Sequence, residues 1–195
     1  MKNNHPVFIV LEGLDGSGKS TTARLLAEAF GAVCMTTPTP VVRGFRDELI
    51  ESFEGSQEAA QLFYLATVFD ASQRIQSLLA RGQSVVLDRY FLSTQAYAAF
   101  RGSTLDLDAF SASLQPADLT VFIDVPLELR RERLLGRGAN AADRETLADA
   151  TNATLLEEFE RRRVLDVVGE LLWLDAVSMD PDEVVATILR ALARR

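Results

Sequence analysis

Short apolar runs recur along the chain and alternate with stretches of helical spacing. The first run, Val7 to Leu11, is apolar without a break, which is typical of a strand buried on both faces. Similar runs predict further strands at residues 32–36, 84–87, 119–125 and 171–174. Helices are predicted at residues 20–30, 43–53, 56–81, 92–100, 107–114, 127–135, 147–168 and 181–193.

This alternation predicts an α/β fold in which a five-stranded parallel sheet carries helices on both faces. The length, 195 residues, suits one domain, so we expect residues 1–195 to form a single unit. The least regular stretch, residues 136–143, reads Gly-Arg-Gly-Ala-Asn-Ala-Ala-Asp between two helices. Glycine-flanked arginine is typical of a mobile lid, here at about residues 136–146, although a plain connector would have the same composition.

The charge balance limits the partners. A net charge of −8 argues against nucleic acid and against a membrane surface, which both need a basic face. No run approaches the roughly 20 apolar residues that span a bilayer, and the first six residues lack the layout of a signal peptide. We therefore expect a cytoplasmic protein. The only cysteine, Cys34, lies in a predicted strand, where we expect a buried thiol.

The sharpest motif follows the first strand. Residues 13–20 fit the pattern G-x-x-x-x-G-K-[ST] at every fixed position, with a buried strand before them and a helix after them. Glycines let successive backbone N–H groups point at phosphate oxygens, and the helix presents its positive end to the same anion. Lys19 is expected to reach the β- and γ-phosphates of ATP, and the Ser20 hydroxyl to bind Mg²⁺.

A second motif ends the third predicted strand, where Asp88-Arg89-Tyr90 follows Val85-Val86-Leu87. Ligands of open α/β sheets bind outside the carboxyl ends of the strands. Asp88 is therefore expected to hold Mg²⁺ through water, and Arg89 to grip a phosphate with two hydrogen bonds.

A third feature is a cluster of arginines before and within the irregular segment. Arg133 and Arg137 are four residues apart, on one face of the helix that leads into it. Arginines brought to a transferring phosphoryl group neutralise its developing charge. For Arg130 and Arg131, a helix face exposed to solvent explains the sequence equally well. The cluster comprises Arg130, Arg131, Arg133, Arg137 and Arg144.

Together these residues resemble the thymidylate kinases, a family of nucleoside monophosphate kinases. Residues 12–21 are similar to that family's phosphate loop, including its acid at Asp15, and Asp88-Arg89-Tyr90 with Ser93, Ala96 and Tyr97 resembles its D-R-Y-x-x-S-x-x-A-Y segment. Asp124-Val125-Pro126 resembles a strand-end D-x-P motif, and residues 133–145 resemble the lid.

The resemblance implies ATP-dependent phosphorylation of a nucleoside monophosphate, with dTMP the expected acceptor, and a homodimer. It implies that Asp15 contacts the acceptor sugar, that Arg89 positions the acceptor phosphate, and that Phe63 and Tyr97 flank the base. The residues expected to bind the acceptor are Asp15, Phe63, Thr67, Arg74, Arg89, Ser93 and Tyr97. Catalytic arginine would come from the lid, at Arg133, Arg137 or Arg144. The residues expected to bind ATP are Gly13, Asp15, Gly16, Ser17, Gly18, Lys19, Ser20 and Thr21.

The chain departs from the family at three acceptor positions. Thr37-Pro38-Thr39-Pro40 lacks the arginine of an R-x-P segment, although Arg43 and Arg46 follow. Thr67 stands where we expect a base-reading arginine, and Arg74 is the next arginine on that helix. Ala98 replaces a glutamine. We therefore expect dTMP to be a poor acceptor or one acceptor among several.

Other functions remain open from these residues. The acceptor could be another nucleotide, a nucleoside or a small phosphorylated metabolite. A regulatory module that only binds nucleotide is a second possibility, against which the retained Lys19, Asp88 and Arg89 argue. A GTP switch is excluded, since its N-K-x-D motif needs a lysine and the chain has only Lys2 and Lys19.

Overall fold

A computed structural model describes residues 5–138 and 144–194, so residues 139–143 of the expected lid lie outside the described residues. Its centre is a five-stranded parallel sheet in the order β2-β3-β1-β4-β5, which confirms the predicted fold class. The strands are β1 (Phe8–Glu12), β2 (Val33–Thr36), β3 (Val85–Asp88), β4 (Leu119–Asp124) and β5 (Glu170–Asp175).

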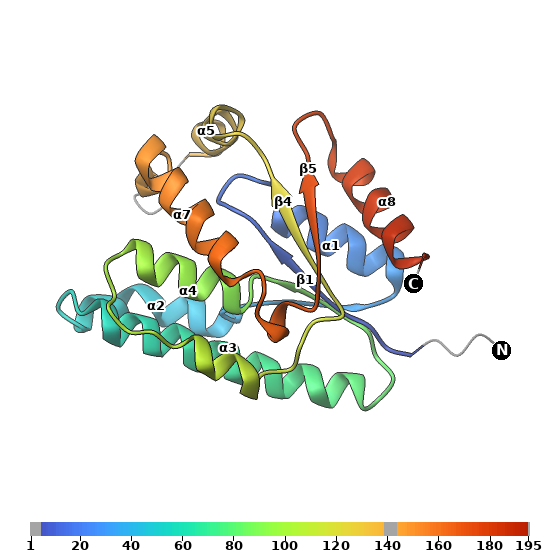
Figure 1. The fold of residues 1–195 in the computed structure, drawn as a ribbon, viewed down its shortest axis with the longest axis horizontal. Helices are drawn as coiled ribbons and strands as arrows, with labels where there is room; N and C mark the ends of the chain where they lie inside the picture. The colour runs from blue at the N-terminus through green and yellow to red at the C-terminus, as the bar shows by residue number, and fades with distance from the viewer. Residues whose placement is uncertain (1–4, 139–143, 195) are drawn as a thin grey trace.

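Helices cover both faces of this sheet (Figure 1). Helices α1 (Lys19–Phe30) and α8 (Pro181–Leu192) pack on one face. The other face is covered by α3 (Gln57–Leu79), α4 (Phe91–Phe100) and α7 (Asp149–Arg162). The remaining elements are α2 (Pro40–Ser52), α5 (Leu127–Gly136) and the 3₁₀ helices η1 (Asp108–Ser113) and η2 (Asp166–Val168). No helix of the described ranges is long and apolar enough to cross a membrane.

The central strand β1 explains why its sequence is apolar without alternation. Phe8 and Val10 pack into the core under α3, α4 and α7, whereas Ile9 and Leu11 pack into the core under α1 and α8. All four side chains are buried because both faces of β1 carry helices.

The edge strand β2 corrects one expectation. Cys34 is exposed, not buried, because β2 pairs with β3 alone and leaves its other edge open. The sequence of a strand does not report its place in the sheet, and an edge position was not anticipated.

Three predicted helices also differ from the structure, two in their boundaries and one in its type. Helix α2 begins at Pro40 and not at residue 43, because Pro40 takes the first helical turn and the Thr39 hydroxyl accepts a hydrogen bond from the Val42 N–H at 3.5 Å. The helix expected at 147–168 ends at Arg162, and Val167 and Val168 enter the core from a separate 3₁₀ turn. The segment at 107–114 is 3₁₀ and not α-helical.

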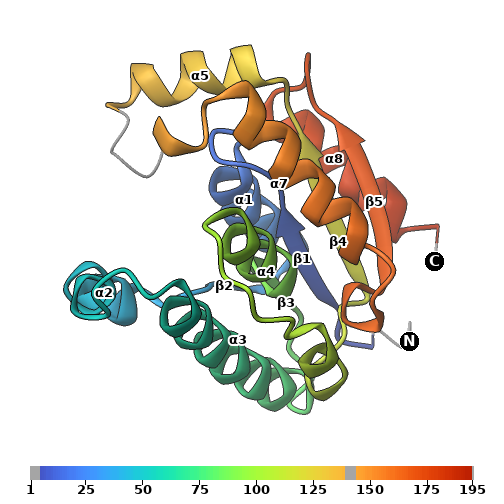
Figure 2. The same cartoon turned by 60° about the vertical axis from the view of Figure 1, so that its left-hand side comes forward.

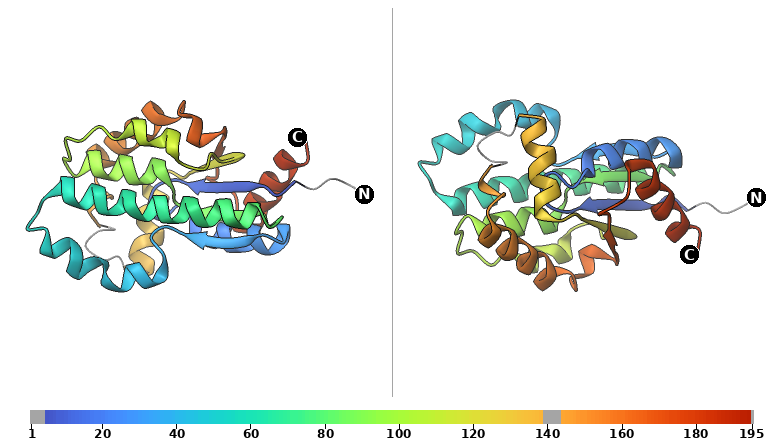
Figure 3. Two further views of the ribbon diagram at one scale, coloured as in Figure 1. Left: turned by 90° about the horizontal axis from the view of Figure 1, so that it is seen from below. Right: turned by 90° about the horizontal axis from the view of Figure 1, so that it is seen from above.

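The order of the strands determines where a ligand can bind. The chain leaves β1 toward β3 and β2 and later returns past β1 to β4, so the carboxyl end of β1 lies where the direction of winding changes. Helix α2 stands away from the sheet beside α3 (Figure 2). Both ends of the described chain lie on one side of the molecule, and α2 and α5 lie toward the other side (Figure 3).

Candidate active site

The phosphate loop joins β1 to α1 and its backbone is held close to β4. A side chain at Gly13 would place its Cβ 2.6 Å from the Ile123 carbonyl oxygen, and the residue has a φ of +138°. Only glycine fits there. Gly18, with a φ of 94°, caps α1 without a side-chain hydrogen bond, so the first N–H groups of that helix face the loop.

Lys19 lies inside this loop and is 5% exposed. Its Nζ donates to the Leu14 carbonyl at 2.7 Å, a contact that folds the side chain over the loop. Burial, and then the positive charge of Arg89, lower the pKa of Lys19 to about 7.

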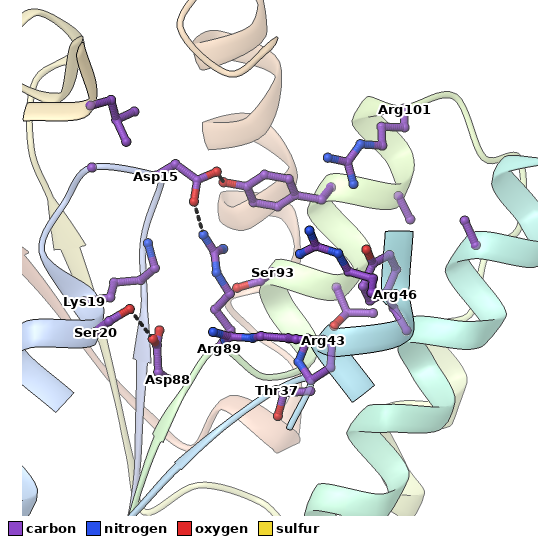
Figure 4. Close-up of a pocket in the computed structure, with 18 of the residues that line it drawn as sticks. Asp15, Lys19, Ser20, Thr37, Arg43, Arg46, Asp88, Arg89, Ser93 and Arg101 are labelled. Carbon is purple, nitrogen blue, oxygen red and sulfur yellow. Dashed lines mark hydrogen bonds and ion pairs between the residues drawn. The ribbon is translucent and has the colours of Figure 1, made fainter. Parts of the chain in front are cut away.

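Asp88 meets the start of α1 beside the phosphate loop. Leu11 pairs with Asp88 across β1 and β3, so the ends of these two strands are neighbours. The Ser20 hydroxyl donates to Asp88 Oδ2 at 2.5 Å (Figure 4). Asp88 Oδ1 is buried and has no hydrogen-bond partner among the described residues. A hydroxyl and a carboxylate with an unused oxygen fit the oxygen ligands and bridging waters that Mg²⁺ prefers.

Asp15 and Arg89 form an ion pair across the mouth of the loop (Figure 4). Tyr97 adds a second contact, because its hydroxyl donates to Asp15 Oδ2 at 2.8 Å. Burial opposes ionisation of Asp15, but Arg89 and Lys19 outweigh it and lower the pKa of the carboxyl to about 2. The Arg89 guanidinium also lies 5.1 Å from the centre of the Tyr97 ring.

Glu12 is a buried carboxylate to which the sequence analysis gave no structural role. It ends β1 and accepts hydrogen bonds from the N–H groups of Tyr90 and Ser93, at 3.0 and 3.2 Å, and from the Ser93 hydroxyl. Burial raises the pKa of Glu12, while Ser93 and Arg89 lower it. These contacts hold the turn after β3 against β1, and they explain why Ser93 follows the Asp-Arg-Tyr motif.

Arg130 is the second buried charge that holds the loop. It is 1% exposed and donates to the Val125 carbonyl at 3.0 Å, to the Asp15 carbonyl at 3.2 Å and to Asn152. The solvated-face reading is therefore wrong for Arg130. Arg131 is partly exposed and contacts Leu147 and Asp149, away from the loop.

These groups line one cavity of ≈ 560 Å³. Its wall includes all the expected ATP-binding residues except Gly13 and Ser17, which belong to the loop but do not line the cavity. It also includes Asp88, Arg89, Ser93 and Tyr97. Further lining residues from α2, α3 and α4 are Arg43, Arg46, Gln57, Ala60, Gln61, Tyr64, Thr94, Ala98 and Arg101.

The expected lid arginines divide into two groups. Arg133 and Arg137 line the cavity, and Arg133 donates to the Gly16 carbonyl at 3.4 Å. Arg137 also lowers the pKa of Asp15, which puts its charge within reach of the loop. Arg144 does not line the cavity and is exposed.

Three expected acceptor residues lie outside the cavity. Phe63 packs against Phe53 and Tyr64, the Thr67 hydroxyl donates to the Tyr64 carbonyl, and Arg74 pairs with Asp70. The cavity side of α3 is instead formed by residues 57, 60, 61 and 64. A shift of one residue turns a helical position by about 100°, so Tyr64 faces the cavity and Phe63 does not.

A phosphate loop and a facing arginine in one cavity, at the carboxyl ends of parallel strands, define a P-loop kinase. The family model described as thymidylate kinase matches residues 11–177. The chain therefore belongs to the thymidylate kinase family and is a nucleoside monophosphate kinase that uses ATP.

Known thymidylate kinases are similar to this protein over most of its length. A thymidylate kinase of Cupriavidus metallidurans is 33% identical over 200 aligned residues, which cover 93% of this chain and 98% of the relative. A probable thymidylate kinase of Thermococcus onnurineus is 30% identical and covers 85% and 91%. The solved thymidylate kinase of Candida albicans superimposes with a TM-score of 0.75 at 25% identity, over 97% of this chain and 92% of that one.

The lowered pKa of Lys19 predicts proton uptake when ATP binds. Above pH 7 the lysine of the free protein is largely neutral, and the polyphosphate favours its charged form. At pH 8 binding should take up close to one proton and should weaken as the pH rises further. Calorimetry in two buffers of different ionisation enthalpy measures this number.

The Lys19→Arg variant is the matched control, because a guanidinium stays charged at every pH of the experiment. It should lose the proton uptake. Equal uptake by both proteins would assign the proton to another group and contradict the lowered pKa.

Proposed function

We propose that this enzyme transfers the γ-phosphoryl group of ATP to dTMP and releases ADP and dTDP. The observation that carries the proposal is the Asp15–Arg89 ion pair, which joins the phosphate loop to an arginine inside one cavity. We assign this arginine to the acceptor phosphate. Family membership supports dTMP as the acceptor. This proposal replaces the expectation, drawn from Thr67 and Ala98, that dTMP would be a poor acceptor or one acceptor among several. Direct transfer between two bound nucleotides needs both subsites in one enclosed space.

The donor side consists of the phosphate loop and its helix. Lys19 would leave the Leu14 carbonyl for the β- and γ-phosphates, and the loop N–H groups would hold the remaining oxygens. Mg²⁺ bound between Ser20, Asp88 and these phosphates would neutralise part of their charge. The unused Asp88 oxygen supports this assignment.

The acceptor phosphate would lie at Arg89. Arg43 and Thr37 line the same side of the cavity (Figure 4). The Thr37 hydroxyl is buried without a hydrogen-bond partner among the described residues. Arg43 comes from α2 and contacts the Thr36 hydroxyl. We assign Arg43 the role of the arginine that the Thr37-Pro38-Thr39-Pro40 segment lacks.

The acceptor nucleoside would lie between α3 and α4. Tyr64 from α3 and Tyr97 from α4 both line this part of the cavity and offer aromatic faces to a base. Asp15, held by Arg89 and Tyr97, is the carboxylate assigned to the sugar hydroxyl. Arg133 and Arg137 would neutralise charge on the transferring group.

The homodimer, the cytoplasmic location and the single domain of residues 1–195 with a lid at about 136–146 stay predictions. The lid includes residues 139–143, which lie outside the described residues.

ADP release over a panel of nucleoside monophosphates tests the proposal. We expect dTMP to give the highest kcat/KM, at or above about 10⁴ M⁻¹s⁻¹, the lower end of the usual range for enzymes. Nucleosides without a phosphate should be inactive, because Arg89 then has no anion to hold. Turnover of other monophosphates without turnover of dTMP would overturn the acceptor and keep the kinase.

The two arginines that line the cavity at the end of α5, Arg133 and Arg137, have a separate test. Replacing Arg133 or Arg137 by Ala should lower kcat, by on the order of 10³ for the one that contacts the transferring group. The KM for dTMP should change much less. Arg144→Ala is the matched control and should keep kcat near the wild-type value, since Arg144 is exposed and outside the cavity. A wild-type kcat in both the Arg133→Ala and Arg137→Ala variants would remove these residues from the chemistry.

A further inference from the structure

The cavity side of α3 carries no arginine or other charged side chain that could bind the base. The cavity side of this helix presents Gln57, Ala60, Gln61 and Tyr64, and the following position of that side, Val68, is fully buried in the core. Gln61 is engaged within the protein, because its Nε2 donates to Gln95 Oε1 at 2.7 Å and to the Leu105 carbonyl at 3.3 Å, and its Oε1 accepts from the Ser103 hydroxyl. Ala98, where the family has glutamine, adds no hydrogen bond.

Arg101 lies where such a side chain would be useful. It follows the last residue of α4, one helical turn beyond Tyr97, and lines the cavity together with Thr94, Tyr97 and Ala98. Its guanidinium lies 5.8 Å from the centre of the Tyr97 ring. Figure 4 shows the Arg101 side chain among those that line the cavity. The aromatic contact holds the side chain against the ring that would flank the base.

The donors of Arg101 are mostly unused. Among the described residues its guanidinium makes one polar contact, with Glu145 at 3.4 Å, which is long for a charge-assisted hydrogen bond. Both partners are partly exposed, so this ion pair is weak. A guanidinium has five N–H donors, and most of them therefore remain for a ligand.

We propose that Arg101 reads the base of the acceptor by donating hydrogen bonds to a carbonyl oxygen on its edge. This inference rests on the proposed function, in which the acceptor is a nucleoside monophosphate. A guanidinium has no acceptor, so it pairs with the O4 carbonyl of thymine or uracil and not with the N4 amino group of cytosine. The pocket then selects pyrimidines that carry a carbonyl group at position 4. The arginine that recognises this group lies at the end of α4 and not on α3.

The test compares Arg101→Met with the wild-type enzyme on dTMP, dUMP and dCMP. Methionine keeps most of the apolar stem and removes the donors. We expect kcat/KM for dTMP and dUMP to fall about 10- to 100-fold, as for the loss of a base-reading contact, while the value for dCMP stays or rises. Dissociation constants from calorimetry should show the same change in the dTMP to dCMP ratio.

Glu145→Gln is the matched control. It removes the ion pair and keeps the arginine, so it should leave the dTMP to dCMP ratio unchanged. An equal loss for all three acceptors in Arg101→Met, or the same change of ratio in Glu145→Gln, would make Arg101 a structural residue and overturn the inference. A wild-type enzyme that turns over other monophosphates but not dTMP would instead overturn the proposed function.

Discussion

The ion pair between Asp15 and Arg89 connects the two halves of the site. Asp15 belongs to the loop after β1 and Arg89 to the turn after β3, two strands that are neighbours in the sheet. Arg89 has a φ of 69°, a left-handed backbone conformation that is costly for a residue with a side chain. Burial would penalise either charge alone, and together they hold the phosphate loop and Arg89 in one arrangement.

Two further buried ionisable side chains keep this pair in position. Glu12 binds the backbone of the turn that carries Arg89, and Arg130 binds the carbonyl of Asp15 itself. Each is satisfied by several hydrogen bonds, which is the condition under which a buried charge is tolerated. The carboxyl end of β1, the turn after β3 and the start of α5 are thus connected by hydrogen bonds around the cavity. The proposed phosphoryl transfer requires such preorganisation.

The sequence predicted the parts of the molecule that depend on local chemistry. The phosphate loop needs glycines, a lysine and a hydroxyl at fixed spacing, and buried strands need apolar residues on both faces. Both features could therefore be predicted from the sequence. The roles of Glu12 and Arg130 could not be predicted, because a buried ionisable side chain is recognised only when its partners from distant elements are known. The strand order, and with it the exposure of Cys34, is equally a property of the tertiary structure.

The acceptor pocket was predicted least well, for a geometric reason. Its walls come from two helices whose rotation about their axes decides which side chains face the ligand. On α3, Tyr64 lines the cavity and the neighbouring Phe63 does not, and Thr67 and Arg74 also lie outside it. Arg101 belongs to none of the sequence motifs, and only the structure shows its contact with Tyr97.

The most direct test of the account is the pattern of initial velocities over a grid of ATP and dTMP concentrations. If one cavity holds both nucleotides and the phosphoryl group passes directly between them, the double-reciprocal lines must intersect. Parallel lines would mean that ADP leaves before dTMP binds and that a phosphorylated enzyme carries the group. That result, or the absence of ADP release with dTMP at any concentration, would contradict the account.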